Sequence, residues 1–93
     1  MKGNTMKVQN ITSNNGNKIA NQFIVNDDNG NTYFQSYNSM IVKLNGDRVE
    51  LDQKYWNYSN TTGKYRNIFL NETIKDTRAK IKNGTYILTD LNK

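Results

Sequence analysis

Few side chains in this chain could catalyse a reaction, because the sequence contains neither histidine nor cysteine. Those two residue types supply the commonest general base, the commonest metal ligand and the thiol nucleophile. The acidic residues that remain are Asp27, Asp28, Asp47, Glu50, Asp52, Glu72, Asp76 and Asp90. No motif places two of them together, and neither a serine–lysine motif nor a glycine-rich phosphate loop is present. We therefore expect no catalytic residues, no metal site and no cofactor, and we predict that the protein is not an enzyme.

The stretch NDDNGN, residues 26–31, is a candidate for a calcium-binding loop. Such a loop needs an oxygen ligand at its first position and a glycine at its sixth. Placing Gly30 at the sixth position puts Val25 at the first, where no oxygen ligand is available. We therefore interpret the stretch as a turn, in which aspartate, asparagine and glycine are all common.

Basic side chains form a more suggestive pattern. Lys75, Arg78 and Lys82 are three and four residues apart, so they line one stripe of a helix. The neighbouring stripe, expected to face inward, consists of Ile74, Thr77 and Ile81. Cations on one helix face can contact nucleic-acid phosphates, and the chain carries a net charge of +5. The alternative is a solvated helix face on a lysine-rich protein.

Large aromatic side chains are concentrated in the stretch before this helix, residues 51–70. The stretch holds the only tryptophan, Trp56, and three of the six tyrosines. If it is extended, Trp56 and Tyr58 face the same way and Tyr55 faces the other. Two interpretations stay open: the rings fill a core that is poor in aliphatic residues, or some of them anchor an interface.

Two further basic residues, Lys64 and Arg66, lie in the same stretch and flank Tyr65. Cations beside flat rings are what a surface needs to bind phosphates and stack on bases. The predicted binding residues are Trp56, Tyr58, Lys64, Tyr65, Arg66, Lys75, Arg78 and Lys82.

The elements that must position these residues begin with strands separated by asparagine-rich turns. Strand patterns cover residues 6–12, 18–25 and 32–37. In the second of them, Ile19, Phe23 and Val25 are expected on one face of the sheet.

A hairpin follows, with Asn45 and Gly46 as its two-residue loop. A loop of this sequence takes positive φ at both central positions. The resulting register places two pairs on one face, Val42 with Val49 and Met40 with Leu51. The other face then carries Ile41, Lys43, Arg48 and Glu50.

Helical patterns occupy the last third of the chain. Ser59 is a good N-cap for a first helix over 60–70, and Asn71 can cap a second helix over 72–82. The first helix places Tyr65, Ile68 and Phe69 on one face. Alternation over residues 85–91 predicts a final strand that returns to the sheet.

Together these patterns predict an α+β fold: an antiparallel β-meander with two short helices and a C-terminal closing strand. The apolar fraction is 34%, which is low for a globular protein, so we expect one small domain over residues 1–93 with a thin core. Residues 1–5 are expected to be disordered. We find no signal peptide and no membrane-spanning run, so we expect a cytoplasmic protein with no membrane partner.

The second half of the chain resembles a known family. The segments SYNSMIVKL, VELDQKYWNYSNTTGKYRNIFL and IKNGTYILTDLN lie between residues 36 and 92. They are similar to a family of small uncharacterised proteins from phages and prophages of Gram-positive bacteria. The most specific element is a W-x-Y-S-x-T-T run, here Trp56, Tyr58, Ser59, Thr61 and Thr62. The family often has aspartate where this chain has Asn57 and histidine where it has Tyr65.

The resemblance implies a phage-encoded binding protein rather than a catalyst. Our leading hypothesis is a protein that inhibits or diverts a host nucleic-acid machine, with an anti-CRISPR inhibitor of a CRISPR nuclease complex as the specific form. Its partner would be a host or defence-system protein or nucleoprotein. The alternatives are a small basic nucleic-acid-binding accessory protein and a self-assembling structural phage component that forms a homodimer through an unpaired strand edge.

Overall fold

The computed structural model describes residues 6–13 and 15–92, so the predicted disorder of residues 1–5 lies outside the described residues. Within these residues the chain forms six strands and two helices. They are β1 (Lys7–Thr12), β2 (Lys18–Asn26), β3 (Thr32–Ser36), β4 (Ser39–Asn45), β5 (Arg48–Asp52), α1 (Asn60–Leu70), α2 (Ile74–Lys82) and β6 (Tyr86–Thr89). The predicted α+β class is confirmed.

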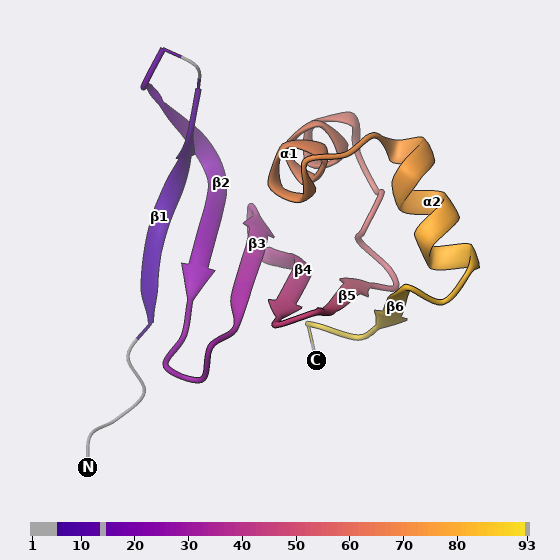
Figure 1. Ribbon diagram of the computed structural model, residues 1–93. Coiled ribbons are helices and arrows are strands. Elements are labelled where there is room, and N and C mark those ends of the chain that lie inside the picture. The colour runs from indigo at the N-terminus through magenta and orange to yellow at the C-terminus, as the bar shows by residue number, and fades with distance from the viewer. Residues whose placement is uncertain (1–5, 14, 93) are drawn as a thin grey trace.

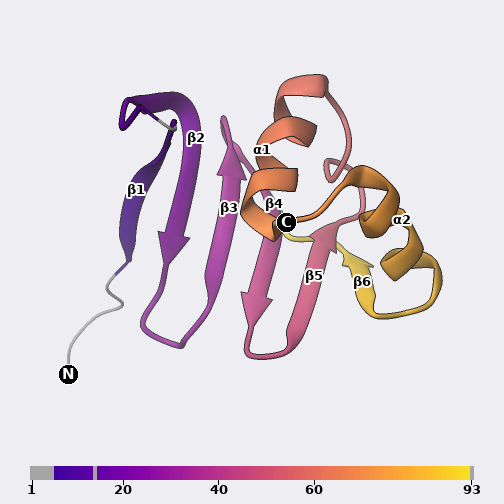
Figure 2. The same ribbon diagram turned by 45° about the horizontal axis from the view of Figure 1, so that its top comes forward.

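All six strands join one sheet, in which their spatial order equals their order in the sequence. The pairs from β1 to β5 are antiparallel, whereas β6 runs parallel to β5. A parallel partner needs a crossover connection, and α1 and α2 together supply it. Both helices lie over the same face of the sheet (Figures 1 and 2), above its β3 to β6 side. The predicted closing strand is therefore present.

The core lies between the sheet and α1. Phe34 of β3 is fully buried, and the ring of Phe69 from α1 stacks on it with 5.7 Å between centroids. Leu51 of β5 is also fully buried in the same cluster. Burying one such side chain contributes about 1.5–3 kcal/mol, so these few contacts hold α1 on the sheet.

The hairpin between β4 and β5 differs from the predicted register by two residues. Its loop is Gly46–Asp47, and Val42 pairs with Leu51. Gly46 has a φ of +59°, whereas Asn45 stays in the strand and donates a side-chain hydrogen bond to Asn31. Glycine at the first central position alone is the pattern of a type II′ turn. A shift of two residues preserves the face of each side chain, so Val42 and Leu51 share a face as predicted, and both are fully buried.

A bulge moves Met40 out of the predicted pairing and brings Ile41 into the core. Met40 pairs with Gln35 and Val42 with Phe34, so Ile41 has no partner on β3. An extra residue in one strand turns two successive side chains toward the same face. As a result both Ile41 and Val42 are fully buried.

The predicted common face of Ile19, Phe23 and Val25 is also wrong. Asn21 has a φ of +64°, which interrupts the alternation within β2. Ile19 and Ile24 pack against the core cluster. Phe23 and Val25 flank Ile24, so they lie on the opposite face of the sheet.

The helix caps agree with the sequence at one of two positions. Ser59 is the N-cap of α1, as predicted, and its side chain accepts a hydrogen bond from the N–H of Thr62. Asn71 is instead the left-handed C-cap of α1, with a φ of 56°. Thr73 caps α2 and forms a capping box with Asp76. Because a reciprocal box satisfies two free N–H groups, it fixes the start of α2 two residues later than predicted.

The turn over residues 26–31 is held by hydrogen bonds to Asp27. The Asp27 carboxylate accepts hydrogen bonds from the N–H of Asn29, from the N–H of Asn31 and from the Asn31 side chain. These bonds, the side-chain bond from Asn31 first, hold the pKa of Asp27 below its usual value. Among the described residues no group of three possible metal ligands gathers, and none of their helices is long and apolar enough to cross a membrane.

Candidate functional site

The aromatic loop, residues 53–59, starts from a buried carboxylate at the end of β5. Asp52 is 1% exposed and accepts hydrogen bonds from the N–H groups of Lys54 at 3.0 Å, Tyr55 at 2.8 Å and Leu91 at 2.8 Å. Burial alone would raise its pKa, but these bonds and one from Asn92 outweigh burial and lower the pKa below its usual value. The carboxylate therefore fixes the start of the loop and the C-terminal segment together.

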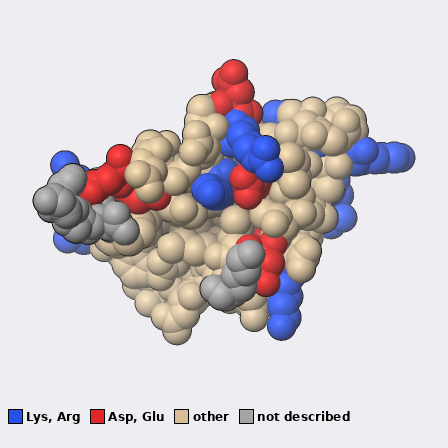
Figure 3. Space-filling view, turned by 90° about the horizontal axis from the view of Figure 1, so that it is seen from below, with Lys and Arg blue, Asp and Glu red and all other residues tan. Residues whose placement is uncertain are grey.

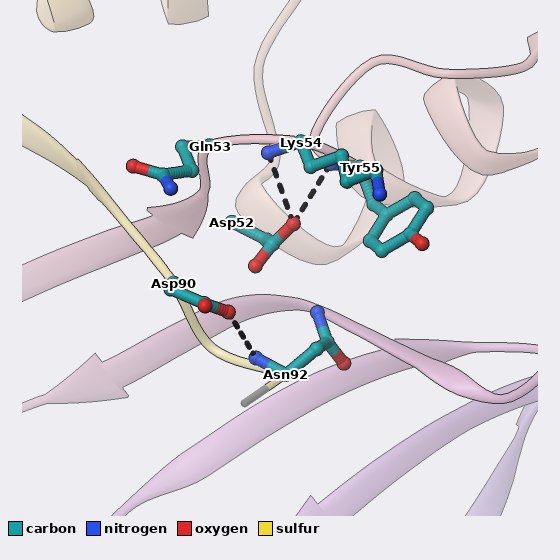
Figure 4. A pocket seen from close by; sticks show the side chains of 6 residues that line it. All are labelled: Asp52, Gln53, Lys54, Tyr55, Asp90 and Asn92. Atoms are coloured by element: carbon teal, nitrogen blue, oxygen red, sulfur yellow. Dashed lines mark hydrogen bonds between the residues drawn. The ribbon is translucent and has the colours of Figure 1, made fainter.

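A small cavity of about 200 Å³ lies beside this carboxylate (Figure 4). Asp90 borders it, and its carboxylate accepts a hydrogen bond from the N–H of Asn92. The Asn92 side chain in turn accepts from the N–H of Met40 and donates to its carbonyl. The contacts of Asp52 with Leu91 and of Asn92 with Met40 join distant parts of the chain, so we assign this cavity a structural role.

The aromatic loop is not extended, which corrects the predicted directions of its rings. The N–H of Trp56 donates to the carbonyl of Asp52 at 3.0 Å, as in a turn. The rings of Tyr55 and Tyr58 meet edge to face, with 5.4 Å between centroids. Tyr55 and Tyr58 therefore lie together, whereas the prediction placed them on opposite sides.

Arg66 holds the far end of the loop and is buried, which corrects its predicted place on an exposed basic surface. The residue is 1% exposed. Its Nη1 donates to the carbonyl of Trp56 at 2.8 Å and to Oδ1 of Asn57 at 3.1 Å, and its Nη2 donates to Oδ1 of Asn67 at 2.9 Å. Burial and repulsion from Arg78 lower its pKa. A guanidinium has five donors in a rigid fork, so it can bridge a loop and a helix in this way.

Trp56 joins α1 to α2 through two arginines. The guanidinium carbons of Arg66 and Arg78 lie 5.3 Å and 5.6 Å from the centre of the indole ring. Both distances are within the range of cation–π attraction. Trp56 is half-buried and also packs against the core cluster. It therefore serves the fold, and it places the exposed Arg78 over an aromatic surface.

The basic stripe of α2, defined as Lys75, Arg78 and Lys82, is fully on the surface. All three residues are exposed, whereas Thr77 is buried and Ile81 packs against the core. The two ion pairs found among the described residues, Arg48–Glu50 and Lys80–Glu72, leave the stripe without a carboxylate partner. Figure 3 shows one face of the molecule, with acidic and basic groups intermixed near its middle and several basic side chains at the edge on the side of α2.

The other predicted residues lie apart from this stripe. Tyr58 is 49% exposed on the loop. Lys64 is exposed, and its Nζ lies 5.3 Å from the centre of the Tyr65 ring. Tyr65 is half-buried and, with Ile19, borders a hollow next to the β1–β2 turn. The structure thus brings Trp56 and Arg78 together but places Tyr65 on another side of α1, and Lys64 lies between the two sides.

Sequence reasoning missed a buried polar cluster around Glu72. Its carboxylate accepts hydrogen bonds from Nζ of Lys80 at 2.7 Å, the hydroxyl of Thr77 at 2.6 Å and the hydroxyl of Tyr86 at 2.8 Å. Burial would raise the pKa of Glu72, but these three bonds lower it. The bond to Glu72 raises the pKa of Lys80, and burial first and then the same carboxylate raise the pKa of Tyr86. The cluster ties α2 to β6.

No local sequence pattern predicts this cluster, because Glu72 and Tyr86 are 14 residues apart. An acidic residue just before a helix usually complements the helix dipole, so its position alone does not indicate a buried cluster. Only the return of β6 beside β5 brings the tyrosine hydroxyl to the carboxylate.

Residues 6–85 match the model of a family of unknown function, DUF8033. The chain belongs to the DUF8033 family. No curated protein and no solved structure matches the chain. The DUF8033 match contains the whole aromatic loop, Arg66 and the basic stripe. Tyr86 and Leu91, which anchor Glu72 and Asp52, lie beyond the matched part of this DUF8033 protein.

Proposed function

We propose that this protein is a non-enzymatic, phage-encoded binding protein that inhibits or diverts a nucleic-acid machine of its host. A CRISPR nuclease complex is the specific target that we propose, which would make the protein an anti-CRISPR acting in the host cytoplasm. The resemblance of residues 36–92 to phage and prophage proteins supports the origin. The lack of histidine and cysteine supports binding rather than catalysis.

The basic stripe of α2 is the observation that carries the proposal. Its three cations are exposed and have no carboxylate partner among the described residues. Arg78 also lies over the Trp56 ring. Arginine and tryptophan are enriched at the centres of interfaces, and unpaired cations attract an acidic protein surface or an RNA.

The net charge limits how such an inhibitor could act. Proteins that imitate DNA must be strongly acidic, whereas this chain carries a net charge of +5. We therefore propose that the protein contacts an acidic surface of its target, or RNA held within it, and does not imitate DNA.

An affinity capture from host lysate tests the proposal, using the Lys75→Gln/Lys82→Gln double variant and the matched double variant Lys7→Gln/Lys18→Gln. Both variants remove two exposed positive charges, the first from α2 and the second from the strands. We expect one main partner, a component of a nucleic-acid machine, that survives nuclease treatment and is lost only with the α2 variant. Hydrolytic or transferase activity that disappears on changing one carboxylate would contradict the proposal.

Direct nucleic-acid binding is the second candidate function, and the unpaired cations of the stripe favour it. It predicts that capture collapses after nuclease treatment and that affinity falls steeply with salt. In that case Arg78→Ala should reduce the slope of log affinity against log salt by about 1. A self-assembling component would instead be recognised by light scattering, since β1 and β6 each leave one edge without a strand partner among the residues that the structure describes.

A further inference from the structure

A second cavity lies between the aromatic loop, α1 and the start of α2. Its volume is about 320 Å³. It is lined by Asn57, Ser59, Asn60, Gly63, Lys64, Arg66, Asn67 and Ile74. None of these described lining residues is acidic, and two of them are cationic. The wall of the cavity is therefore positive and polar.

The buried cation in this wall has no opposite charge beside it. The three acceptors of Arg66 are a backbone carbonyl and two asparagine side chains, all neutral. Its buried Nε has no hydrogen-bond partner among the described residues. Arg66 and Gly63 both line the cavity, and a Cβ built on Gly63 would lie 3.6 Å from Nη2 of Arg66. A charge taken out of water usually has a counter-charge, and here the protein supplies none in contact.

Neighbouring charged residues do not neutralise the positive charge of Arg66. Glu72 attracts Arg66 electrostatically but is hydrogen-bonded to Lys80, Thr77 and Tyr86 instead. Arg78 adds a second positive charge near Arg66. The field in the cavity therefore favours an anion.

The first turn of α1 borders the cavity through Asn60 and Gly63. Ser59 uses its side chain for the N–H of Thr62 and its carbonyl for the N–H of Gly63. Asn60 and Thr61 occupy the first two helical positions, whose N–H groups have no acceptor within a helix. The first turn of α1 contains no acidic residue that could balance the helix dipole. Free donors and an unbalanced dipole at a helix start are the features of an anion site.

We propose that this cavity binds a phosphate group, held by the N–H group of Asn60, by Lys64 and by the charge of Arg66. The ligand class that fits best is a phosphodiester of single-stranded nucleic acid. Tyr58 lies between Asn57 and Ser59, which line the cavity. The residue is 49% exposed although its ring meets Tyr55 edge to face, so part of the ring is open to a stacking base. This site deepens the proposed function, on which it rests, by naming a ligand of the target complex.

Amide NMR spectra of the wild-type protein, recorded during titration with inorganic phosphate and then with a short single-stranded oligonucleotide, test the site. We expect saturable shifts at Asn60 and the Arg66 Nε–H with both probes. If the shifts reach half-saturation at a far lower concentration of oligonucleotide than of phosphate, the ligand is a nucleic-acid strand. If the two concentrations are equal, the ligand is a free phosphate. The absence of saturable shifts at these two groups overturns the proposal.

Charge reversal separates this site from a general effect of basic surface. Lys64→Glu should weaken phosphate and oligonucleotide binding at least tenfold, whereas Lys18→Glu on β2 should leave both unchanged. Both lysines are exposed, so both variants should fold. Equal losses in the two variants would show a general effect of surface charge and would overturn the site.

The same variants distinguish failure here from failure of the proposed function. If the cavity binds phosphate but does not contribute to partner capture, the Lys64→Glu variant loses phosphate binding and still captures the partner. If the basic stripe is not the partner surface, the Lys75→Gln/Lys82→Gln variant retains both phosphate binding and the captured partner. Phosphate binding that survives Lys64→Glu overturns the cavity site whatever the capture experiment gives.

Discussion

Two charged residues, Asp52 and Arg66, are each about 1% exposed, and both hold the aromatic loop. Asp52 collects three backbone N–H groups, and Arg66 donates to the carbonyl of Trp56 and to two asparagine side chains. Buried charges are tolerated when hydrogen bonds replace the lost water. In a chain with few aliphatic residues, these polar contacts order a loop that apolar packing alone would leave loose.

The Asp52 anchor gives a prediction at a single residue. Asp52→Asn replaces a carboxylate oxygen that accepts N–H bonds with an amide that cannot accept all of them. We expect the free energy of unfolding to fall by about 2 kcal/mol, the usual scale for hydrogen bonds to a charged group. Urea unfolding followed by tryptophan fluorescence measures this directly.

The matched control for this change is Asp47→Asn in the exposed β4–β5 loop. A surface substitution away from such contacts is expected to change stability by less than about 0.5 kcal/mol. Equal effects of the two variants would mean that the hydrogen bonds of Asp52 do not stabilise the fold.

At the scale of elements, β2 contains Asn21, a residue type that is uncommon in strands. Asn21 has a φ of +64°, and the N–H of Tyr37 donates to its carbonyl at 2.7 Å. Asparagine tolerates this conformation better than most residues, whereas a β-branched side chain does not. Asn21→Val should therefore destabilise the protein by about 1–2 kcal/mol, although valine is the better strand former.

Thermal or urea unfolding of Asn21→Val and Asn21→Gly checks this expectation. Glycine adopts positive φ freely, so the Gly variant should stay within about 0.5 kcal/mol of the wild type. A valine variant as stable as the wild type would show that the positive φ of Asn21 is not required for the stability of the fold.

The start of α2 gives a second prediction for an element. Thr73 accepts from the N–H of Asp76, and the Asp76 carboxylate accepts from the N–H of Thr73. Thr73→Ala should cost about 1 kcal/mol of stability by removing the N-cap. Thr61→Ala is the control, because Thr61 is exposed within α1 and alanine has the higher helix propensity. Equal losses in urea unfolding would argue against the capping box.

For the whole molecule, the shifted pKa values predict a window of stability. Asp27, Asp52 and Glu72 have folded-state pKa values below their usual ones. Their contribution is present above the unfolded pKa of about 4 and is lost as pH falls through the folded values. Lys80 and Tyr86 have raised folded-state pKa values. Their contribution is present below about pH 10 and is lost as pH rises further.

We therefore expect the free energy of unfolding to be highest between about pH 5 and pH 10 and to decline on both sides. Glu72→Gln should make both limbs shallower, because Glu72 is the common partner of Lys80 and Tyr86. Urea midpoints measured across this range test the expectation. An acid limb of unchanged steepness in the Glu72→Gln variant would place the titrating groups elsewhere.

The sequence by itself determined the features that depend on neighbouring residues. The α+β class, the sequence of elements, the Ser59 cap and the buried and exposed stripes of α2 all follow from periodicity and capping chemistry. Each of these signals lies within one or two turns of the chain, so no knowledge of distant contacts is needed.

Only the tertiary structure decided the features that join distant parts of the chain. The parallel pairing of β6, the burial of Arg66 and the partners of Asp52 belong to this group. Asp52 and Leu91 are 39 residues apart, and no local pattern encodes their bond. The bulge at Ile41 and the positive φ of Asn21 also escaped prediction, because each gives up local preference to fit packing across the sheet.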